Sequence, residues 1–238
     1  MSELCKWLHL QVDQLPMVTF PFSRKNLPKN GIYFFYECGE FWGHGGAKQR
    51  IVRVGTHRDG NFANRISSHY LNNDADMDFG EDDAKPSDWS IFRKNIGRAI
   101  LSKTKDSYIK IWDQDFIKKE THEHFKKKRD IEKEKRLEAE ITKIIRKSFT
   151  FRFVIMEAQA NRMGSQGLES PLIGTLASCE LCGPSQDWMG NYSPKNQIRR
   201  SGLWLIQHLR DAAICETDKD IILQAIQNTK RWLSEHVS

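Results

Sequence analysis

The chain has 238 residues, of which 39% are apolar and 29% charged, enough to bury one substantial core and a small appended element. The longest apolar runs, such as 32–36 and 153–156, are far shorter than the roughly 20 residues of a membrane helix, which excludes an integral membrane protein. The net charge of +6 and pI near 9.0 favour a polyanionic partner without requiring one.

The N-terminus and the cysteines predict a reducing, cytoplasmic location. Residues 1–15 carry Glu3 and Asp13 and lack the basic start and cleavage site of a secretory signal. Five scattered cysteines, an odd number, argue against a disulfide framework. Cys179 and Cys182 form a Cys-x-x-Cys pair. We interpret the pair as fortuitous, because no second pair at zinc-ligand spacing accompanies it; distant histidines are the alternative.

Two strands are expected early in the chain. The turn signal at 28–31 precedes the β-branched and aromatic run 32–36, which is typical of a strand. A Gly-rich stretch, 39–46, leads to a second short strand at 51–54. The connection suits a hairpin with an enlarged loop, so we expect antiparallel neighbours.

Helices are expected next. Within 62–70, apolar residues recur every fourth position and so share one helix face, while Arg65 and His69 share a different face. The acidic segment 74–88 is interpreted as an exposed, solvated loop. Ser87 or Asp88 is expected to cap a further helix that ends near residue 102.

The segment 118–147 is the most highly charged part of the chain, with 12 basic and 7 acidic residues. It lacks Gly and Pro, which predicts one long, largely exposed helix that packs through a few apolar residues: Leu137, Ile141, Ile144 and Ile145. Two interpretations stay open. The helix is a basic arm along DNA phosphates, or its charges form i,i+4 pairs on a solvated surface.

A third strand and a further helix follow. Residues 149–156 alternate aromatic and polar side chains and then turn apolar, which predicts a centrally placed strand. Residues 168–176 show a helical apolar stripe with Glu169 beside it. Pro171 fits that helix only within its first turn.

The C-terminal part is expected to be helical after a loop. Residues 183–196 contain Pro and Gly and predict the loop, and 199–213 have helical patterning. A last helix is expected from Asp218, with Thr217 and Asp220 resembling a capping box.

Several short motifs occur in a fixed order. Gly31-Ile32-Tyr33 lies on the first strand, Arg53-Val54-Gly55 ends the second, and a helix carries Arg65 and His69. A later helix contains Glu169 followed by Leu172-Ile173. This ordered set resembles the GIY-YIG nuclease family over roughly residues 30–180, although no single triplet in it is specific.

The resemblance implies an α+β fold with a small three-stranded antiparallel sheet flanked by helices. It implies an N-terminal extension at 1–29 and a nuclease domain at 30–182, interrupted by a long charged helical insertion at 103–148. The loop and helices of 183–238 are expected to pack on that domain.

The resemblance also implies roles for the motif residues. Tyr33 would be the general base or orient the attacking water, and Glu169 would be the single carboxylate ligand of Mg²⁺ or Mn²⁺. Arg65 would clamp phosphate oxygens, and His69 would orient the nucleophile, accept its proton or bind phosphate. Without the resemblance, Tyr33 would be an ordinary sheet residue, and the others surface side chains.

The sequence departs from the family pattern at the second triplet. Arg53 stands where a second tyrosine is expected; it would bind the scissile phosphate, support a phenolate at Tyr33, or mark a degenerate site. The spacing from Gly55 to Arg65 is slightly long, with an enlarged loop expected near Asp59. The family asparagine has two candidate counterparts, Asn191 and Asn196.

We therefore expect a metal-dependent DNA endonuclease with Tyr33, Arg53, Arg65, His69 and Glu169 in its site. A non-catalytic nucleic-acid-binding module with a degenerate site is the alternative. A helical interaction protein that acts through the charged segment would leave the ordered motifs unexplained.

Overall fold

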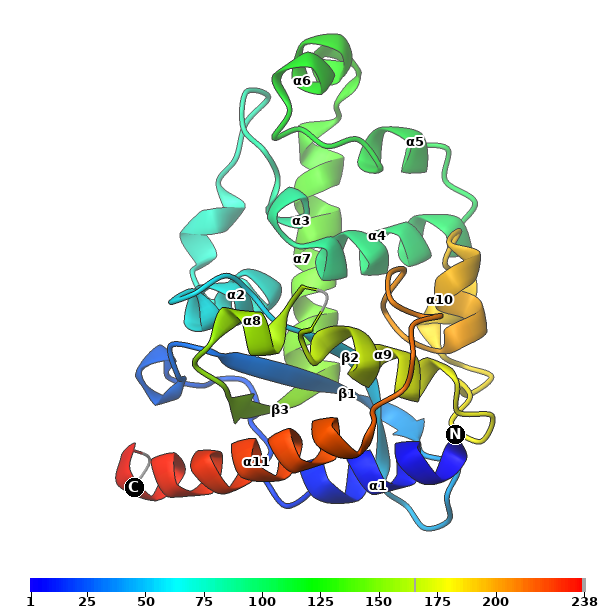
Figure 1. The fold of residues 1–238 in the computed structure, drawn as a ribbon. Coiled ribbons are helices and arrows are strands. Elements are labelled where there is room, and N and C mark those ends of the chain that lie inside the picture. Colours follow the sequence, from blue (N-terminus) through cyan, green and yellow to red (C-terminus); the bar gives the residue numbers. More distant parts are fainter. Residues whose placement is uncertain (165, 237–238) are drawn as a thin grey trace.

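Three antiparallel strands, β1 (Gly31–Phe41), β2 (Gln49–Gly55) and β3 (Phe149–Ile155), form an open sheet in the order β2-β1-β3 (Figure 1). The structure is a computed structural model that describes residues 1–164 and 166–236. The expected α+β fold with a small three-stranded antiparallel sheet is confirmed. The prediction of a central third strand is wrong: β1 is buried on both faces along most of its length, and β3 lies at an edge.

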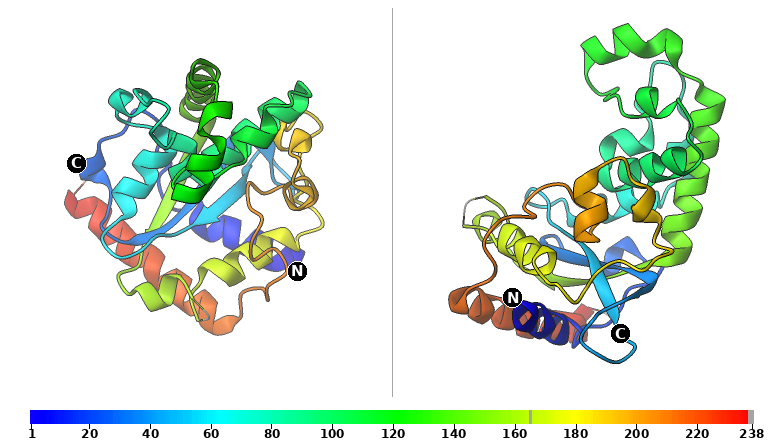
Figure 2. Two further views of the ribbon diagram at one scale, coloured as in Figure 1. Left: turned by 90° about the horizontal axis from the view of Figure 1, so that it is seen from above. Right: turned by 90° about the vertical axis from the view of Figure 1, so that its right-hand side faces the viewer.

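One face of the sheet is covered by α1 (Ser2–Val12), α9 (Glu169–Ala177) and α11 (Glu216–His236). In Figures 1 and 2, α1 and α11 lie side by side. Pro171 is the third residue of α9, where a missing N–H costs no intrahelical hydrogen bond. The apolar core on this face includes Leu8, Val12, Ile32, Phe34, Tyr36, Leu172, Ile173, Ile222 and Ile226.

The opposite face is covered by α2 (Phe62–Tyr70), α4 (Ile91–Lys103) and α7 (Ile131–Ser148). Because side chains alternate along a strand, Tyr33 and Phe35 of β1 both point to this second core. The core includes Tyr33, Phe35, Phe62, Ile66, Phe92, Ile96, Ile141, Phe151 and Trp204.

Short helices connect these layers. They are α3 (Pro86–Trp89), α5 (Ile109–Trp112), α6 (Lys119–Phe125), α8 (Gln159–Arg162) and α10 (Asn196–Ser201), with 3-10 turns η1 (Arg24–Asn26), η2 (Asp74–Met77), η3 (Lys126–Lys128) and η4 (Met189–Tyr192). Within the described chain, no helix is both long enough and apolar enough to cross a bilayer.

The charged segment is not the single helix that we expected. It forms α6, η3 and α7, and the chain breaks direction at Asp130, whose side chain caps α7 by accepting a hydrogen bond from Lys133 N at 2.9 Å. Figure 2 shows α6 and the first turns of α7 projecting from the body of the molecule. The predicted helix is therefore interrupted by a new N-cap at Asp130, although the segment contains no Gly or Pro.

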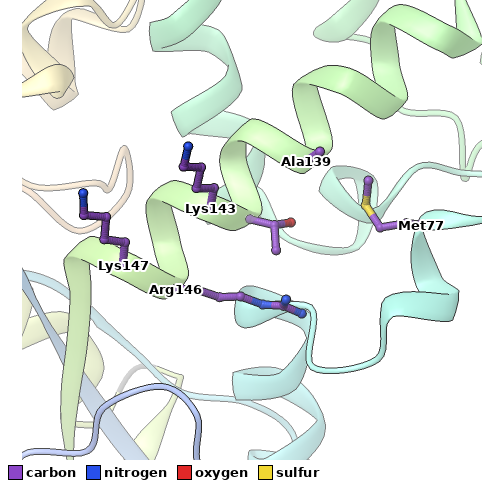
Figure 3. A pocket seen from close by; sticks show the side chains of 6 residues that line it. Met77, Ala139, Lys143, Arg146 and Lys147 are labelled. Atoms are coloured by element: carbon purple, nitrogen blue, oxygen red, sulfur yellow. The ribbon is translucent and has the colours of Figure 1, made fainter.

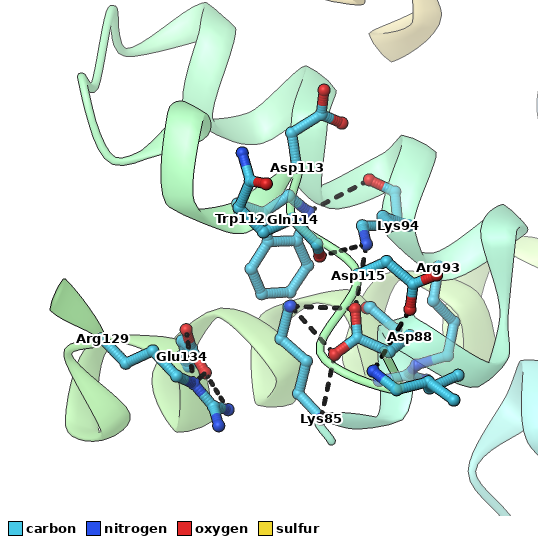
Figure 4. Close-up of polar contacts among 12 residues, drawn as sticks. Lys85, Asp88, Arg93, Lys94, Trp112, Asp113, Gln114, Asp115, Arg129 and Glu134 are labelled. Carbon is cyan, nitrogen blue, oxygen red and sulfur yellow. Dashed lines mark hydrogen bonds and ion pairs between the residues drawn. The ribbon is translucent and has the colours of Figure 1, made fainter. Parts of the chain in front are cut away.

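Two glutamates of α7 that look like surface residues in the sequence are buried. Glu134 pairs with Arg129 at 2.6 Å, and both side chains are fully shielded from solvent (Figure 4). Glu138 pairs with Arg93 of α4 at 2.6 Å, again with both side chains shielded. Ser87 N donates to the other Glu138 oxygen at 2.7 Å. The helix thus packs through ion pairs as well as through its apolar stripe.

The acidic segment 74–88 is exposed only in part. Its last residues fold inward, where the Asp88 carboxylate lies 3.0 Å from Lys85 Nζ and 2.9 Å from Lys94 Nζ (Figure 4). The Lys85 ammonium also faces the rings of Trp112 and Phe116. The loop prediction therefore fails at its C-terminal end, because buried partners compensate these charges.

Two other helix boundaries differ from the prediction. Ser90, rather than Ser87 or Asp88, caps α4 by accepting a hydrogen bond from Arg93 N at 3.3 Å. α11 begins at Glu216, so Thr217 lies inside the helix and not at its cap. In each case a polar residue close to the predicted cap accepts a hydrogen bond from a backbone N–H at the start of the helix. For α11 this residue is Asp218, which accepts from Cys215 N.

The helix predicted at 199–213 is wrong. α10 ends at Ser201, because Gly202 adopts a left-handed conformation with φ of 68°. The following residues run along the sheet instead, where Trp204 N donates to Val52 O at 2.8 Å. The apolar residues that suggested a helix therefore pack as an irregular segment beside β2.

A buried carboxylate of β1 lies against the second core. The Glu37 Oε2 atom accepts indole N–H groups from Trp188 and Trp204, each at 2.8 Å. Burial raises the pKa of Glu37 to about 7, although both indole hydrogen bonds act in the opposite direction.

We predict that Glu138→Gln lowers the free energy of unfolding by about 3 kcal/mol, because it leaves the Arg93 charge buried without a counter-charge. Urea denaturation measures this change. Glu140→Gln is the matched control, since Glu140 is exposed two residues along the same helix. Equal midpoints for the two variants would show that the buried pair does not stabilise the fold.

We also predict a pH dependence that comes from Glu37. Because its folded pKa of about 7 exceeds the unfolded value, its contribution to stability is complete at low pH and is lost as the pH rises through 7. Between pH 5 and 8, the wild-type free energy of unfolding should fall by on the order of 3 kcal/mol relative to Glu37→Gln. Parallel profiles for the two proteins would refute this assignment.

Candidate active site

Tyr33 lies at the centre of the candidate site, fixed by close packing of the sheet. Gly55 is its partner in β2, and a Cβ added at Gly55 would lie 2.3 Å from Tyr33 Oη. A Cβ added at Gly31 would lie 2.4 Å from Val154 O in β3. The glycines of both triplets are therefore required by close approach, which places the Tyr33 ring across the end of β2.

The Tyr33 hydroxyl contacts His69 of α2, with 2.9 Å between Oη and Nε2. The other ring nitrogen, Nδ1, lies 2.8 Å from Ser90 Oγ. His69 is fully buried, so it is not a surface side chain of α2. Burial, followed by the charge of Arg65, holds the pKa of His69 well below its ordinary value. The ring is thus neutral and fixed at both nitrogens.

Arg53 is buried beside this pair, with 4% of its surface exposed. One terminal nitrogen donates to Trp204 O at 2.6 Å, and the guanidinium lies over the Phe92 ring. Its Nε atom is buried and has no hydrogen-bond partner in the described part of the chain. The positive charge of Arg53 disfavours the protonated form of His69 and opposes the burial-induced rise in the pKa of Glu169.

Arg65 is half-buried on α2 and donates to Trp89 O at 3.1 Å. Its charge acts on His69 and on Glu169, as the charge of Arg53 does. The two guanidiniums therefore give the site a positive potential, as a phosphate-binding site requires.

Glu169 begins α9 and is half-buried. Its Oε1 atom accepts from Thr56 N at 3.3 Å, directly after Gly55 of the second triplet. Burial raises the pKa of Glu169, whereas Arg53 and then the Thr56 N–H oppose that shift. A single carboxylate between cationic side chains fits a Mg²⁺ or Mn²⁺ ion that takes its remaining ligands from water and phosphate oxygens.

The structure thus brings all five predicted residues into one electrostatic unit. Tyr33 and His69 are joined by a hydrogen bond, while Arg53 and Arg65 act on both His69 and Glu169.

The two candidate asparagines are engaged elsewhere. The Asn191 amide donates to the carbonyls of Ser185 and Gln186, and Asn196 accepts from Arg199. Within the described residues, neither hydrogen-bonds to any of the five site residues.

Two histidines near the site were not identified from the sequence. His57 follows Thr56 and is buried, and its Nε2 atom has no hydrogen-bond partner among the described residues. His208 lies 2.7 Å from Asp211, and its charge opposes the burial-induced rise in the pKa of Glu169. His208 lies in the segment predicted to be a helix, and no spacing links either histidine to the motifs.

Comparison with known proteins agrees with this geometry. A family model described as a GIY-YIG domain matches residues 7–231, from α1 to α11. A search of the curated proteins gives no significant match, and neither does a search of the solved structures. Since the family match covers nearly the whole chain and includes the triplets, the arginine-histidine helix and Glu169, the chain belongs to the GIY-YIG domain family.

Proposed function

We propose that the protein is a metal-dependent endonuclease that hydrolyses phosphodiester bonds of DNA. Membership of the GIY-YIG domain family suggests a nuclease. The observation that carries the proposal is the contact between Tyr33 Oη and the neutral His69 ring, at 2.9 Å, beside Glu169 and two arginines. Such a site combines a proton acceptor with positive charge, and phosphodiester hydrolysis needs both.

The hydrogen-bonded chain gives the proton a defined path. Tyr33 Oη accepts a proton from the attacking water and passes its own proton to His69 Nε2. The water oxygen then bonds to phosphorus as the P–O ester bond breaks, and the leaving oxygen takes a proton from solvent, which yields a phosphate monoester and a free hydroxyl. Ser90 holds the imidazole through Nδ1, so the acceptor nitrogen stays directed at Tyr33.

The charged residues would act on the phosphate. Glu169 would hold Mg²⁺ or Mn²⁺, and the bound ion supplies Lewis-acid polarisation of the phosphoryl oxygens. Arg65, which is only half-buried, would bind a non-bridging phosphate oxygen. Arg53 is more deeply buried and would keep Glu169 ionised, a role that differs from that of a second tyrosine.

The ion pairs of the charged segment are not mainly the i,i+4 pairs of a solvated helix, which favours a DNA contact for its exposed lysines. Arg129 pairs with Glu134 inside the segment, and three lysines pair with other segments: Lys126–Asp82, Lys133–Asp106 and Lys135–Asp78. The one i,i+4 pair found within the described segment, Lys119–Glu123, is exposed and 3.9 Å long. Isolated exposed pairs of this kind contribute little to stability.

Exposed lysines on α7 are the best candidates for phosphate contacts. Lys143 and Lys147 border a shallow groove next to Met77 and project from the same side of α7, whereas Arg146 points toward α2 (Figure 3). Arg146 donates to Tyr70 O at 3.1 Å and also to Leu71 O, so it stabilises the end of α2. We assign Lys143 and Lys147 to the DNA backbone.

We predict that purified protein nicks or cuts plasmid DNA with Mg²⁺ or Mn²⁺, and that Glu169→Gln reduces the single-turnover rate at least about 100-fold. The reason is loss of the only carboxylate among the five site residues. Gel analysis of supercoiled, nicked and linear DNA measures the rate.

Glu235→Gln is the matched control, because Glu235 is an exposed glutamate on α11. DNA binding without metal-dependent cutting, in duplex and branched substrates alike, would favour a non-catalytic binding module. A Glu169→Gln variant with full activity would exclude Glu169 as the metal ligand.

A second prediction concerns the proton path. Tyr33→Phe should reduce the single-turnover rate by about 10²- to 10⁴-fold and leave the Kd for DNA nearly unchanged, since the ring packing is retained. His69→Gln should have a similar effect, because an amide accepts a hydrogen bond but does not take up the proton. His236→Gln, at the exposed end of α11, is the control. Normal cutting by Tyr33→Phe would exclude Tyr33 from proton transfer.

A further inference from the structure

Away from the candidate active site, four metal-binding side chains converge. They are Cys5 of α1, His44 in the turn between β1 and β2, and Cys179 and Cys182 just after α9. Their ligand atoms all lie within 4.8 Å of one another. Cys5 and Cys182 are 177 positions apart in the chain, so the cluster is a product of the tertiary fold.

Two distances within the cluster match the edges of a zinc tetrahedron, and the others are at most 4.8 Å. With Zn–S bonds of about 2.3 Å and Zn–N bonds of about 2.05 Å, tetrahedral geometry gives roughly 3.8 Å between sulfurs and roughly 3.6 Å between sulfur and nitrogen. The Sγ atoms of Cys5 and Cys182 are 3.8 Å apart, and Cys179 Sγ lies 3.5 Å from His44 Nε2. A disulfide would need about 2.05 Å between sulfurs, and all five cysteines are free.

We infer that Cys5, His44, Cys179 and Cys182 bind one structural Zn²⁺ ion. Three thiolates and an imidazole suit zinc and do not suit Mg²⁺, which prefers oxygen ligands. Four protein ligands complete a tetrahedron and leave no position for water or substrate, so the ion stabilises structure and does not perform catalysis. Binding to the thiolates releases the thiol protons.

Groups around the cluster are arranged to support the ligands. Gly43 N donates to Cys182 Sγ at 3.4 Å, a contact that stabilises a metal-bound thiolate. A Cβ at Gly43 would lie 1.7 Å from Leu181 O, so only glycine lets the hairpin turn approach the Cys-x-x-Cys segment this closely. The requirement for glycine at position 43 is a second indication that this turn packs directly against the Cys-x-x-Cys segment.

His9 supports the cluster from α1. Ile51 N donates to His9 Nε2 at 3.0 Å, which leaves the ring proton on Nδ1. That nitrogen donates to Cys5 O at 2.9 Å and lies 3.6 Å from Cys5 Sγ. Because His9 is engaged through both nitrogens, it orients Cys5 and is not a fifth ligand.

The interpretation of the Cys-x-x-Cys as fortuitous is therefore replaced by a metal site whose other two ligands come from distant segments. The ion would join α1, the β1–β2 turn and the C-terminal end of α9. Zinc binding does not depend on the proposed nuclease activity, and the two can be tested separately.

Zinc content is the direct test. The full-length protein, purified in reducing buffer without chelator, should contain about one zinc per chain by elemental analysis. Replacement by Co²⁺ should give the visible d–d bands of a tetrahedral site and a thiolate charge-transfer band in the near ultraviolet. Cys179→Ser, Cys182→Ser and His44→Ala should each lose at least about nine-tenths of the zinc, whereas Cys38→Ser and Cys215→Ser should keep it.

A second measurement uses the wild-type chain, so it does not depend on whether variants fold. In the zinc-loaded protein, a thiol reagent should react rapidly with the exposed Cys38 and Cys215, and with the other three cysteines only after a zinc chelator is added. Less than about 0.1 zinc per chain after reconstitution with Zn²⁺ would overturn the proposal. Equal reactivity of all five cysteines with and without chelator would do so too.

Discussion

The buried guanidinium of Arg93 is the interaction on which the second core depends. It donates to the Glu138 carboxylate and carbonyl, to Thr142 Oγ1 and to His69 O, and so joins α4, α7 and α2. A charge without solvent is tolerated only when its hydrogen bonds are satisfied and a counter-charge is present. The arrangement therefore fixes α7 against the sheet.

The same pair determines where the candidate site lies. Arg93 holds the last turn of α2 through the His69 carbonyl, and Ser90, three residues before Arg93, holds the His69 ring. The imidazole is thus positioned from both its backbone and its side chain before it meets Tyr33. The ion pair between α4 and α7 and the contact between His69 and Tyr33 are therefore parts of one hydrogen-bonded structure.

Local patterns were enough to predict the elements whose apolar periodicity is regular. α2 spans the residues that its four-residue spacing predicts, and each strand was located by its β-branched and aromatic residues. The break at Asp130 was missed because Glu134 and Glu138 have the composition of a solvated helix, and nothing local shows that their partners are buried. The helix prediction for the segment after Gly202 failed for a related reason. The backbone N–H of Trp204 donates to β2, and the spacing of apolar residues does not show whether a backbone group finds its hydrogen-bond partner within a helix or in the sheet.

The candidate site was predictable because its residues belong to an ordered set of short motifs. The order located Tyr33, Arg65, His69 and Glu169, and it exposed Arg53 as a departure. The order of the motifs did not show that His69 is buried. The spacing of residues along a helix predicts which way a side chain points, but not which residues of other elements it contacts. His208 and the two distant members of the cysteine cluster, Cys5 and His44, carry no local signal; only long-range contacts bring them to their partners.

The two proposed metal sites lie at opposite ends of the same pair of elements. At one end, Thr56 N, just after β2, donates to Glu169 at the start of α9. At the other end, His44 in the turn before β2 meets Cys179 just after α9. A nine-residue helix is about 13 Å long, so zinc at one end would restrict how α9 tilts against β2 at the other.

Carboxylate ligands need accurate placement, because Mg²⁺ demands near-ideal octahedral geometry. The zinc site would thus orient Glu169 without contacting the substrate, which explains how Cys5, near the start of the chain, contributes to a site built mainly from later residues.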